Sequence, residues 1–343
     1  MSKKINVAVL MGGKSSEHEI SLLSGREVVK NLNRGKYNVI PINISRDGRN
    51  WQVGESENFF LGSPAAVRVR ADKSKAFSLQ SDSTYPKLFK DNNIDLVFIA
   101  LHGSNGEDGR IQGFLDLIDI PYTGSKVLAS ALAMDKIYSR KLFTQVGLKT
   151  PNFVVITKGE GTTKIFKKLK LPVFIKPNNQ GSSVGTAKVI RKKDIKKALN
   201  GAHKFSQFAV VEEFISGTEV TCAVIGNDKP KALPLIEIVP KKEFFDYEAK
   251  YNERLCDEIV PARISKTLTK KTQGAALAAY QILGCRGFGR VDMIIKNNKV
   301  YVLEANTIPG LTPVSLLPKA AKAAGISYRQ LLNEIISFAY PIV

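Results

Sequence analysis

The first third of the chain alternates apolar runs with helical patterns. Continuous apolar runs predict buried strands at residues 5–11, 39–44 and 96–101, and helical periodicity predicts a helix at 20–32. Strands that are apolar on both faces favour a doubly wound parallel sheet with helices on either side. Ligands of such sheets bind in the crevice at the carboxyl ends of the strands.

Two polar loops fall at those carboxyl ends. The loop GGKSSEHEIS begins at Gly12 and carries Glu17, and HGSNGEDG begins with His102, so both side chains are predicted to face a ligand. Residues 14–16 could close over an anion. The alternative is purely structural: Gly12 and Gly13 only turn the chain, and His102 only braces its turn. Because GxGxxG is absent, a dinucleotide is not implied.

A second unit is predicted from Pro151 onward, after a run of helical signals at 124–146. Short strands alternate there with basic helices, which indicates a small α+β module. The predicted strands are 153–156, 173–176, 185–190 and 209–213, and the predicted helices are 163–169 and 193–199.

The segment KPNNQGSSVG, which starts at Lys176, lies between two of these strands and has residues that suit phosphate binding. Lys176 offers charge and Gly181 lets the backbone approach a ligand closely. Ser182 and Ser183 offer hydroxyl and amide donors. It is not the GxxxxGK[ST] loop, because the lysine precedes the glycine. A Gly-Ser hairpin turn without function is equally common.

Acidic and aromatic residues mark two further candidate segments. Glu212 and Glu213 end a strand and Glu219 opens the next, and such carboxylates can accept hydrogen bonds from ribose hydroxyls or a purine amino group. An exposed pair of glutamates often has no function. Residues 244–252, FFDYEAKYN, lack strand or helix periodicity and are predicted to form a lid that excludes water. The alternative is an ordinary surface loop.

Four polar side chains interrupt the apolar pattern of a predicted hairpin, whose strands are 291–295 and 300–305. Side chains alternate faces along a strand, so on each strand two of the four share a face. They are Arg290 and Asp292 on the first strand, and Glu304 and Asn306 on the second.

The length of the hairpin loop decides whether the two carboxylates meet. A three-residue loop, 297–299, places Asp292 opposite Glu304, whereas a two-residue loop places them on opposite faces. Opposed carboxylates followed by the Asn306 amide oxygen are hard ligands that suit Mg²⁺ beside phosphate oxygens, so this chemistry predicts the longer loop. The structural alternative is that Asp292 simply pairs with Arg290.

Helix-capping signals follow the hairpin. Thr312 is predicted as an N-cap with Pro313 in the first helical position. Ser327 and Gln330 form a predicted capping box at the start of the last helix, which runs to Ala339.

Length, charge and cysteine count narrow the possible domain number, partners and metal sites. At 343 residues the chain is too long for one ordinary core, so two or three domains are expected. Its formal net charge of +20 favours anionic partners without choosing among them, and many lysines lie on predicted helix faces that are typically solvated. Three cysteines without paired spacing indicate neither disulfides nor zinc. The sequence shows no signal-peptide or membrane-span pattern, so we expect a cytoplasmic protein.

The order of these motifs resembles one family from about residue 7 to residue 332. GGKSSEHEIS, HGSNGEDGRIQG, YTGS, MDK, KPNNQGSSVG, VEEFISGTE, FDYEAKY, GFGRVDM, LEANTIPGLT and SLLP follow one another as in the D-alanine–D-alanine ligases of the ATP-grasp superfamily. The resemblance implies an α/β fold: an N-terminal parallel-sheet (Rossmann-like) domain followed by an ATP-grasp fold of two α+β subdomains. The corresponding divisions are 1–135, 136–218 and 219–343, the last with the metal site and the lid.

The resemblance also implies which residues bind the nucleotide and the metal. ATP is expected as co-substrate on Lys136, Lys176, Glu212, Glu219 and the lid residue Lys250. Two Mg²⁺ ions, for which Mn²⁺ could substitute, are expected on Asp292, Glu304 and Asn306.

Catalytic and substrate-binding groups are implied in the same way. The first D-alanine is expected on Glu17 with His102 nearby, and the second on Ser315 and Leu316. The other expected catalytic groups are the pair Ser182 and Tyr251, joined by hydrogen bonds to Glu17, and the oxyanion donors Arg290 and the Gly310 amide.

The implied activity joins two D-alanine molecules through a D-alanyl phosphate, for peptidoglycan precursor synthesis. Tyr251 in FDYEAKY favours this dipeptide; a D-alanine–D-lactate type of ligase, or another ATP-grasp carboxylate–amine ligase, is the alternative. D-Alanine and ATP are the expected partners, together with a second copy of the chain in a homodimer. No membrane partner is expected, and the basic helices lack the interleaved aromatic residues that favour nucleic acid.

Overall fold

The structure is a computed structural model that describes residues 4–54, 76–78, 84–240 and 256–340. The chain divides into two units, residues 1–127 with 308–343 and residues 128–307. The three predicted divisions at 135 and 218 stay a prediction, but the residues after 307 group with the N-terminal sheet. None of the described helices is long and apolar enough to cross a membrane.

A mixed sheet organises the first unit. Its five strands are β1 (Ile5–Gly12), β2 (Tyr37–Ile44), β3 (Asn50–Val53), β4 (Ala76–Ser78) and β5 (Leu96–Ile99), in the order β4-β3-β2-β1-β5. The three strands predicted from apolar runs, β2, β1 and β5, pair in parallel, and both β1 and β5 are buried along most of their length. β3 and β4 add antiparallel pairings that the apolar pattern does not predict. The sheet is therefore not wholly parallel, and the Rossmann-like description is not confirmed.

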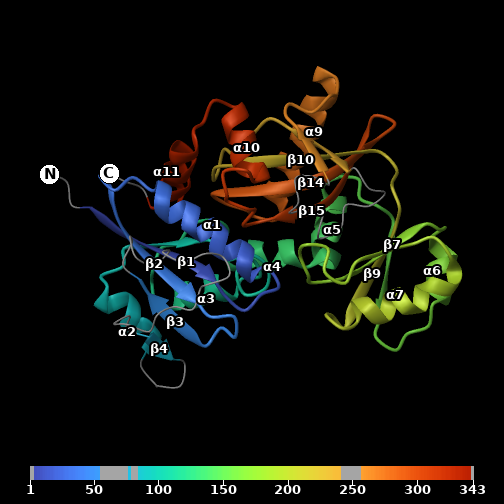
Figure 1. Ribbon diagram of the computed structural model, residues 1–343. Coiled ribbons are helices and arrows are strands. Elements are labelled where there is room, and N and C mark those ends of the chain that lie inside the picture. The colour runs from blue at the N-terminus through green and yellow to red at the C-terminus, as the bar shows by residue number, and fades with distance from the viewer. Residues whose placement is uncertain (1–3, 55–75, 79–83, 241–255, 341–343) are drawn as a thin grey trace. The chain divides into compact units, whose positions relative to one another are not determined.

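Helices from both ends of the chain complete this unit. They are α1 (His18–Asn31), α2 (Thr84–Asp91), α3 (Arg110–Leu117), α10 (Leu316–Ala323) and α11 (Tyr328–Ala339). α1 packs against β1, and α11 packs against α1 (Figure 1). The predicted capping box at the start of α11 is confirmed, with Ser327 and Gln330 bonded to each other's backbone.

The predicted start of the preceding helix is wrong. α10 begins at Leu316 with Ser315 as its N-cap, whereas Thr312 and Pro313 lie in the turn before it. The Ser315 hydroxyl lies 2.7 Å from the Thr312 hydroxyl and accepts the Thr312 amide at 3.2 Å, which closes that turn before the helix starts.

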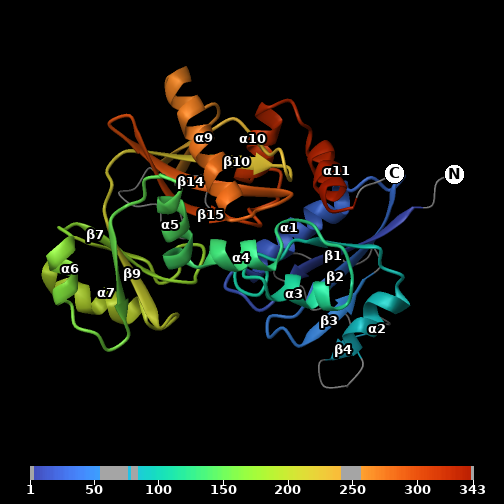
Figure 2. The same ribbon diagram turned by 180° about the vertical axis from the view of Figure 1, so that it is seen from behind.

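The second unit contains a larger antiparallel sheet covered by helices. Its strands are β10 (Thr218–Ile225), β11 (Lys231–Ala232), β12 (Ile236–Pro240), β13 (Cys256–Ile259), β14 (Phe288–Lys296) and β15 (Lys299–Asn306). The order is β13-β12-β10-β14-β15, with β11 beside β10. The covering helices are α4 (Val127–Met134), α5 (Lys136–Gln145) and α9 (Lys266–Ile282), and α9 lies across the sheet in Figure 2.

A smaller antiparallel sheet in the same unit confirms the predicted α+β module. Its strands are β6 (Phe153–Thr157), β7 (Val173–Pro177), β8 (Ala187–Val189) and β9 (Phe208–Glu213), in the order β6-β9-β7-β8. α6 (Thr163–Lys168) and α7 (Ile195–Ala202), the latter preceded by the 3₁₀ turn η1 (Lys192–Asp194), bury apolar side chains against this sheet. Residues 151–213 hold 13 of the 51 Lys and Arg but only 4 of the 31 Asp and Glu, and most of these lysines are exposed.

The predicted hairpin is present, but its loop has two residues instead of three. Lys296 pairs with Lys299 across the turn. Asn297 and Asn298 both have positive φ, 49° and 57°, which is typical of a type I′ turn.

A β-bulge nevertheless brings the two carboxylates opposite each other. Met293 pairs with Val302 and Asp292 pairs with Glu304, so Leu303 is an extra residue in β15. The predicted alignment of Asp292 with Glu304 is confirmed. The predicted loop is wrong because the extra residue lies within the strand and not in the turn.

Glycine substitutions distinguish the two loop lengths. Lys299→Gly places glycine in a strand and should lower the free energy of unfolding by about 0.5–1 kcal/mol. Asn298→Gly relieves a positive φ and should leave that free energy unchanged or raise it by up to about 1 kcal/mol. Denaturant unfolding of both variants measures the difference, and the reverse order of stability would indicate a three-residue loop.

Candidate active site

A cavity of about 440 Å³ in the second unit gathers most of the predicted nucleotide and metal residues. Its volume falls within the range of small-molecule sites. Residues of both sheets of this unit line it, together with the start of α5. The predicted site residues among them are Lys136, Lys176, Glu212, Glu219, Asp292 and Glu304.

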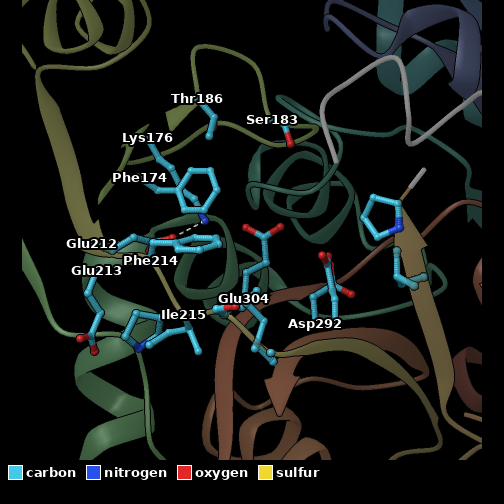
Figure 3. Close-up of a pocket in the computed structure, with 18 of the residues that line it drawn as sticks. Phe174, Lys176, Ser183, Thr186, Glu212, Glu213, Phe214, Ile215, Asp292 and Glu304 are labelled. Carbon is cyan, nitrogen blue, oxygen red and sulfur yellow. Dashed lines mark ion pairs between the residues drawn. The ribbon is translucent and has the colours of Figure 1, made fainter. Parts of the chain in front are cut away.

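The hairpin supplies the acidic side of the cavity. Asp292 stands opposite Glu304, and Arg290 stands opposite Asn306, so the four predicted side chains share one face. Figure 3 shows the carboxylates of Asp292 and Glu304 projecting in the same direction from their strands.

Asp292 accepts hydrogen bonds on both carboxylate oxygens. Arg290 donates to Oδ1 at 2.8 Å and to Oδ2 at 2.9 Å, which is the ion pair considered as the structural alternative. Thr221 donates to Oδ1 at 2.6 Å, and Asn306 donates to Oδ2 at 3.0 Å. These bonds fix the orientation of the carboxylate.

The donor chemistry of the hairpin fits a hard divalent cation. Two carboxylates and one amide oxygen at adjacent cross-strand positions are the ligand types that Mg²⁺ prefers. Within the described ranges, no cluster of three or more His, Cys, Asp or Glu side chains that could hold a metal occurs. The predicted metal ligands Asp292, Glu304 and Asn306 include only two carboxylates, and the third ligand is the amide oxygen of Asn306.

Lys136 links the hairpin to the segment KPNNQGSSVG after β7. Its ammonium lies 3.2 Å from a Glu304 oxygen and donates to the Gln180 carbonyl at 2.8 Å. Asp135 caps α5 by accepting the Ile137 and Tyr138 amides, so the first turn of the helix holds Lys136 in place.

Lys176 lies at the opposite side of the cavity and is paired with Glu212. Its ammonium is 2.6 Å from Glu212 Oε1, as the dashed line in Figure 3 marks, and the other oxygen of Glu212 pairs with Arg140. Burial of Glu212 disfavours its charged form, but Arg140 and Lys176 outweigh that effect and hold the pKa of its carboxyl below the ordinary value. The stabilisation from ionised Glu212 is therefore present above the ordinary carboxyl pKa and is lost as pH falls through the lowered one.

The loop after β7 has a backbone suited to donating amides. Ser182 and Ser183 both have positive φ, 48° and 58°, and Gly185 follows at 70°. Successive left-handed residues are rare outside glycine and occur where a ligand or a tight turn requires them. Gly181 and Ser183 line the cavity.

Glu213 and two aromatic rings form the rim beyond Glu212. Phe174 and Phe214 lie 5.8 Å apart with their rings tilted by 58°, and both line the cavity. Glu213 accepts hydrogen bonds from the backbone amide and the side chain of Asn152, at 2.8 and 3.0 Å. Its carboxylate therefore has a structural role at the end of β9.

The predicted D-alanine-binding residues lie in the first unit. Glu17 and His102 are both buried there. His102 Nδ1 lies 2.9 Å from the Ile308 carbonyl and Nε2 lies 2.7 Å from the Ser24 hydroxyl. Because a carbonyl oxygen only accepts, Nδ1 donates its proton to Ile308, and Nε2 shares a hydrogen bond with the Ser24 hydroxyl. His102 therefore connects the start of HGSNGEDG to Ile308 and to α1, and its predicted place near the first D-alanine stays a prediction.

Further side chains hold the segment that carries Gly310. Glu107 accepts the Ile308 amide at 3.0 Å and the Gly103 amide at 3.1 Å. Ser24 accepts the Leu311 amide at 3.3 Å, and the Tyr328 hydroxyl donates to the Leu311 carbonyl. The acidic motif HGSNGEDG contains Glu107 and could have signalled it, whereas Ser24 and Tyr328 have no sequence signal.

Two predicted site residues, Lys250 and Tyr251, lie outside the described residues, as does the predicted lid at 244–252. Ser315 and Leu316 are found at the start of α10. No sequence signal indicates Arg140 or Thr221, because their roles depend on which strands and helices meet.

Comparisons with known proteins give one consistent match. The family model for the D-ala D-ala ligase N-terminus matches residues 6–125, and the model for the C-terminus matches residues 142–337. A D-alanine–D-alanine ligase from Carboxydothermus hydrogenoformans is 42% identical over 340 residues, which cover 97% of each chain.

Solved structures agree with the sequence match. The D-Ala:D-Ser ligase VanG from Enterococcus faecalis superimposes with a TM-score of 0.85 at 36% identity and covers 98% of this chain and 100% of its own. The D-alanine–D-alanine ligase from Bacillus anthracis complexed with ATP has a TM-score of 0.76 at 32% identity and covers 98% and 97%.

These matches over nearly the whole chain define the class of protein, an enzyme of the ligase type with the ATP-grasp fold. The chain belongs to the D-alanine–D-alanine ligase family.

The bond from Thr221 to Asp292 should contribute to stability. Thr221→Val keeps the shape but removes a buried donor to a carboxylate, so the free energy of unfolding should fall by about 1–2 kcal/mol. Thr269→Val in α9 serves as the control and should change it by less than about 0.5 kcal/mol. Equal stability of Thr221→Val and the unaltered chain in denaturant unfolding would contradict the bond.

Proposed function

We propose that this chain joins two D-alanine molecules into D-alanyl-D-alanine with ATP as the co-substrate. The observation that carries the proposal is one cavity lined by Lys136, Lys176 and the opposed carboxylates Asp292 and Glu304. Cations for phosphate oxygens and hard ligands for a divalent metal in one cavity suit a nucleoside triphosphate. The Bacillus anthracis relative complexed with ATP supports the same ligand.

The reaction proceeds in two steps in this proposal. A carboxylate oxygen of the first D-alanine attacks the γ-phosphorus of ATP, forming D-alanyl phosphate and releasing ADP. The amine of the second D-alanine then attacks the acyl carbon, loses a proton and expels phosphate. Lys136 and Lys176 offset the charge that develops on the transferring phosphoryl group.

Asp292, Glu304 and Asn306 would hold two Mg²⁺ ions, or Mn²⁺ in their place. Their oxygen donors fit these ions, which supply Lewis-acid neutralisation of phosphate oxygens when bound. Arg290 now pairs with Asp292, and it would donate in addition to the oxyanion of the second step.

The remaining assigned roles rest on the family's motifs. Glu17 would hold the ammonium of the first D-alanine, and His102, which is bonded to Ile308, would lie nearby. Ser182 and Tyr251 would form the hydrogen-bonded pair joined to Glu17, and the Gly310 amide would donate to the oxyanion. Ser315 and Leu316 would contact the second D-alanine. Glu219 and Lys250 would contact the nucleotide. Glu212, which lines the cavity and pairs with Lys176 and Arg140, would lie near the adenosine and would also hold Lys176 in place.

A different second substrate is the alternative that a specific observation favours. The D-Ala:D-Ser ligase from Enterococcus faecalis has the same fold at 36% identity, so the family's scaffold accommodates D-serine. A D-lactate acceptor remains the alternative considered from the sequence, and intact FDYEAKY supports the dipeptide.

Three further expectations stay predictions. The dipeptide would enter peptidoglycan precursor synthesis, the enzyme would act in the cytoplasm, and two copies of the chain would form a homodimer.

Product analysis tests the activity and its acceptor together. The purified full chain with ATP and Mg²⁺ should release phosphate and form D-alanyl-D-alanine from D-alanine, and L-alanine should give neither. D-Serine and D-lactate, each supplied with D-alanine, should give less mixed product than dipeptide by mass spectrometry. Mixed product in excess would assign the alternative acceptor, and phosphate release without any of these products would refute the proposal.

Removing one carboxylate tests the metal site. Glu304→Gln loses one ligand charge and the partner of Lys136, so turnover should fall by at least about 100-fold while the chain stays folded. The Mg²⁺ concentration needed for half-maximal rate should rise. Asp228→Asn, an exposed carboxylate in the same unit, is the matched control and should behave as the unaltered enzyme. Near-normal activity of Glu304→Gln would remove Glu304 from the metal site.

A further inference from the structure

Helix α5 carries two cations on one face. Lys136 opens the helix and Arg140 follows four residues later, so their side chains are neighbours on its surface. The side chain of Lys136 is 8% exposed and that of Arg140 is 1% exposed. Arginine is almost never fully buried unless it is paired. Its position therefore calls for an explanation in terms of its partner.

Arg140 reaches the cavity only through other residues. Its guanidinium pairs with one oxygen of Glu212, whose side chain is 3% exposed. The other oxygen of Glu212 holds the Lys176 ammonium at 2.6 Å, and Lys176 lines the cavity. The three side chains form a chain of alternating charge from the interior of the unit to the cavity wall.

The sum of these charges matters to a phosphate. Glu212 and Lys176 alone would be a neutral pair, and in a weakly polar interior the carboxylate would cancel most of the attraction between the ammonium and an anion. Arg140 adds a second cation, so the three groups together carry a charge of +1. Lys176 and Glu212 both line the cavity, and Lys176 is the member that presents a positive charge to an anion there.

Hydrogen bonds tie the start of α5 to Asn178, just after the strand that carries Lys176. Asn178, two residues after Lys176, donates to Asp135 at 2.7 Å. Its carbonyl accepts the Lys136 amide at 3.1 Å and its side chain accepts the Ile137 amide at 3.0 Å. The start of α5 and the segment after β7 therefore form one connected element.

We propose that Arg140 is a positioning residue for nucleotide binding, which neutralises and orients Glu212 so that Lys176 keeps its place and its net charge toward the phosphates. This inference rests on the proposed use of ATP. Arg140 itself touches no substrate.

Direct binding of a non-hydrolysable ATP analogue, measured by titration calorimetry without D-alanine, tests the proposal. Arg140→Met leaves a neutral Glu212–Lys176 pair and should weaken binding by about 10- to 100-fold, the effect of losing a charge-assisted contact. Arg140→Met/Glu212→Gln restores a charge of +1 on Lys176 and should bind within about fivefold of the unaltered enzyme. Arg140→Lys keeps the charge and should do the same.

Steady-state kinetics add a readout that a merely structural role would not move. Arg140→Met should raise the KM for ATP by at least about tenfold and leave the KM for D-alanine within about twofold. Arg191→Met removes an exposed pair with Asp194 and is the matched control, which should leave both unchanged.

Two results would overturn the inference. One is a folded Arg140→Met variant that binds the analogue like the unaltered enzyme; the other is a double variant that binds no better than the single one. If Arg140→Met does not fold, the double variant decides the question, because loss of its analogue binding contradicts the charge argument. Analogue binding that follows the expected order in an enzyme that makes no dipeptide refutes the D-alanine activity and leaves the inference standing.

Discussion

Two like charges, Asp292 and Glu304, stand directly opposite each other on β14 and β15. Opposed like charges on neighbouring strands are destabilising. The negative charge of each carboxylate is balanced by a different cation. Arg290 donates to both oxygens of Asp292 from the same strand, and Lys136 on α5 forms an ion pair with Glu304. The acidic pair thus fixes where the surrounding cations must lie, and a divalent metal would take over part of the compensation.

The cation that neutralises Glu304 comes from α5, a helix that contacts both sheets of the second unit. α5 packs on the larger sheet, yet its first turn bonds to the loop after β7 of the smaller sheet through Asn178. The same helix carries Lys136 toward Glu304 and Arg140 toward Glu212. A displacement of α5 would disturb both sides of the cavity at once. The geometry of the two lysines therefore depends on one rigid helix and not on independent surface loops.

Periodicity in the sequence predicted most of the elements, because buried strands and amphipathic helices produce regular apolar patterns. The parallel strands β1, β2 and β5 follow from such runs, whereas the short strands β3 and β4 have no comparable pattern. Thr312 was the wrong cap because Ser315 uses its hydroxyl to close the preceding turn. Family motifs named the cavity residues, but Arg140 and Thr221 act through contacts between distant segments, which no local pattern records.

The hairpin loop shows how a correct alignment can follow from an incorrect turn. In an unbroken β15 strand, Val300, Val302 and Glu304 would all project from one face. Val300 and Val302 are buried in the core with Met293, whereas Glu304 faces the cavity with Asp292.

Only a shift of one residue between Val302 and Glu304 satisfies both demands, and the bulge at Leu303 supplies it. A three-residue loop would also have aligned the carboxylates, but it would have turned both valines toward the cavity. The sequence does contain this conflict, since apolar residues at 300 and 302 precede an acidic residue at 304 in the same phase. The type I′ turn and the bulge are therefore two parts of one solution, in which the apolar core sets the register near the turn and the acidic pair sets it beyond Leu303.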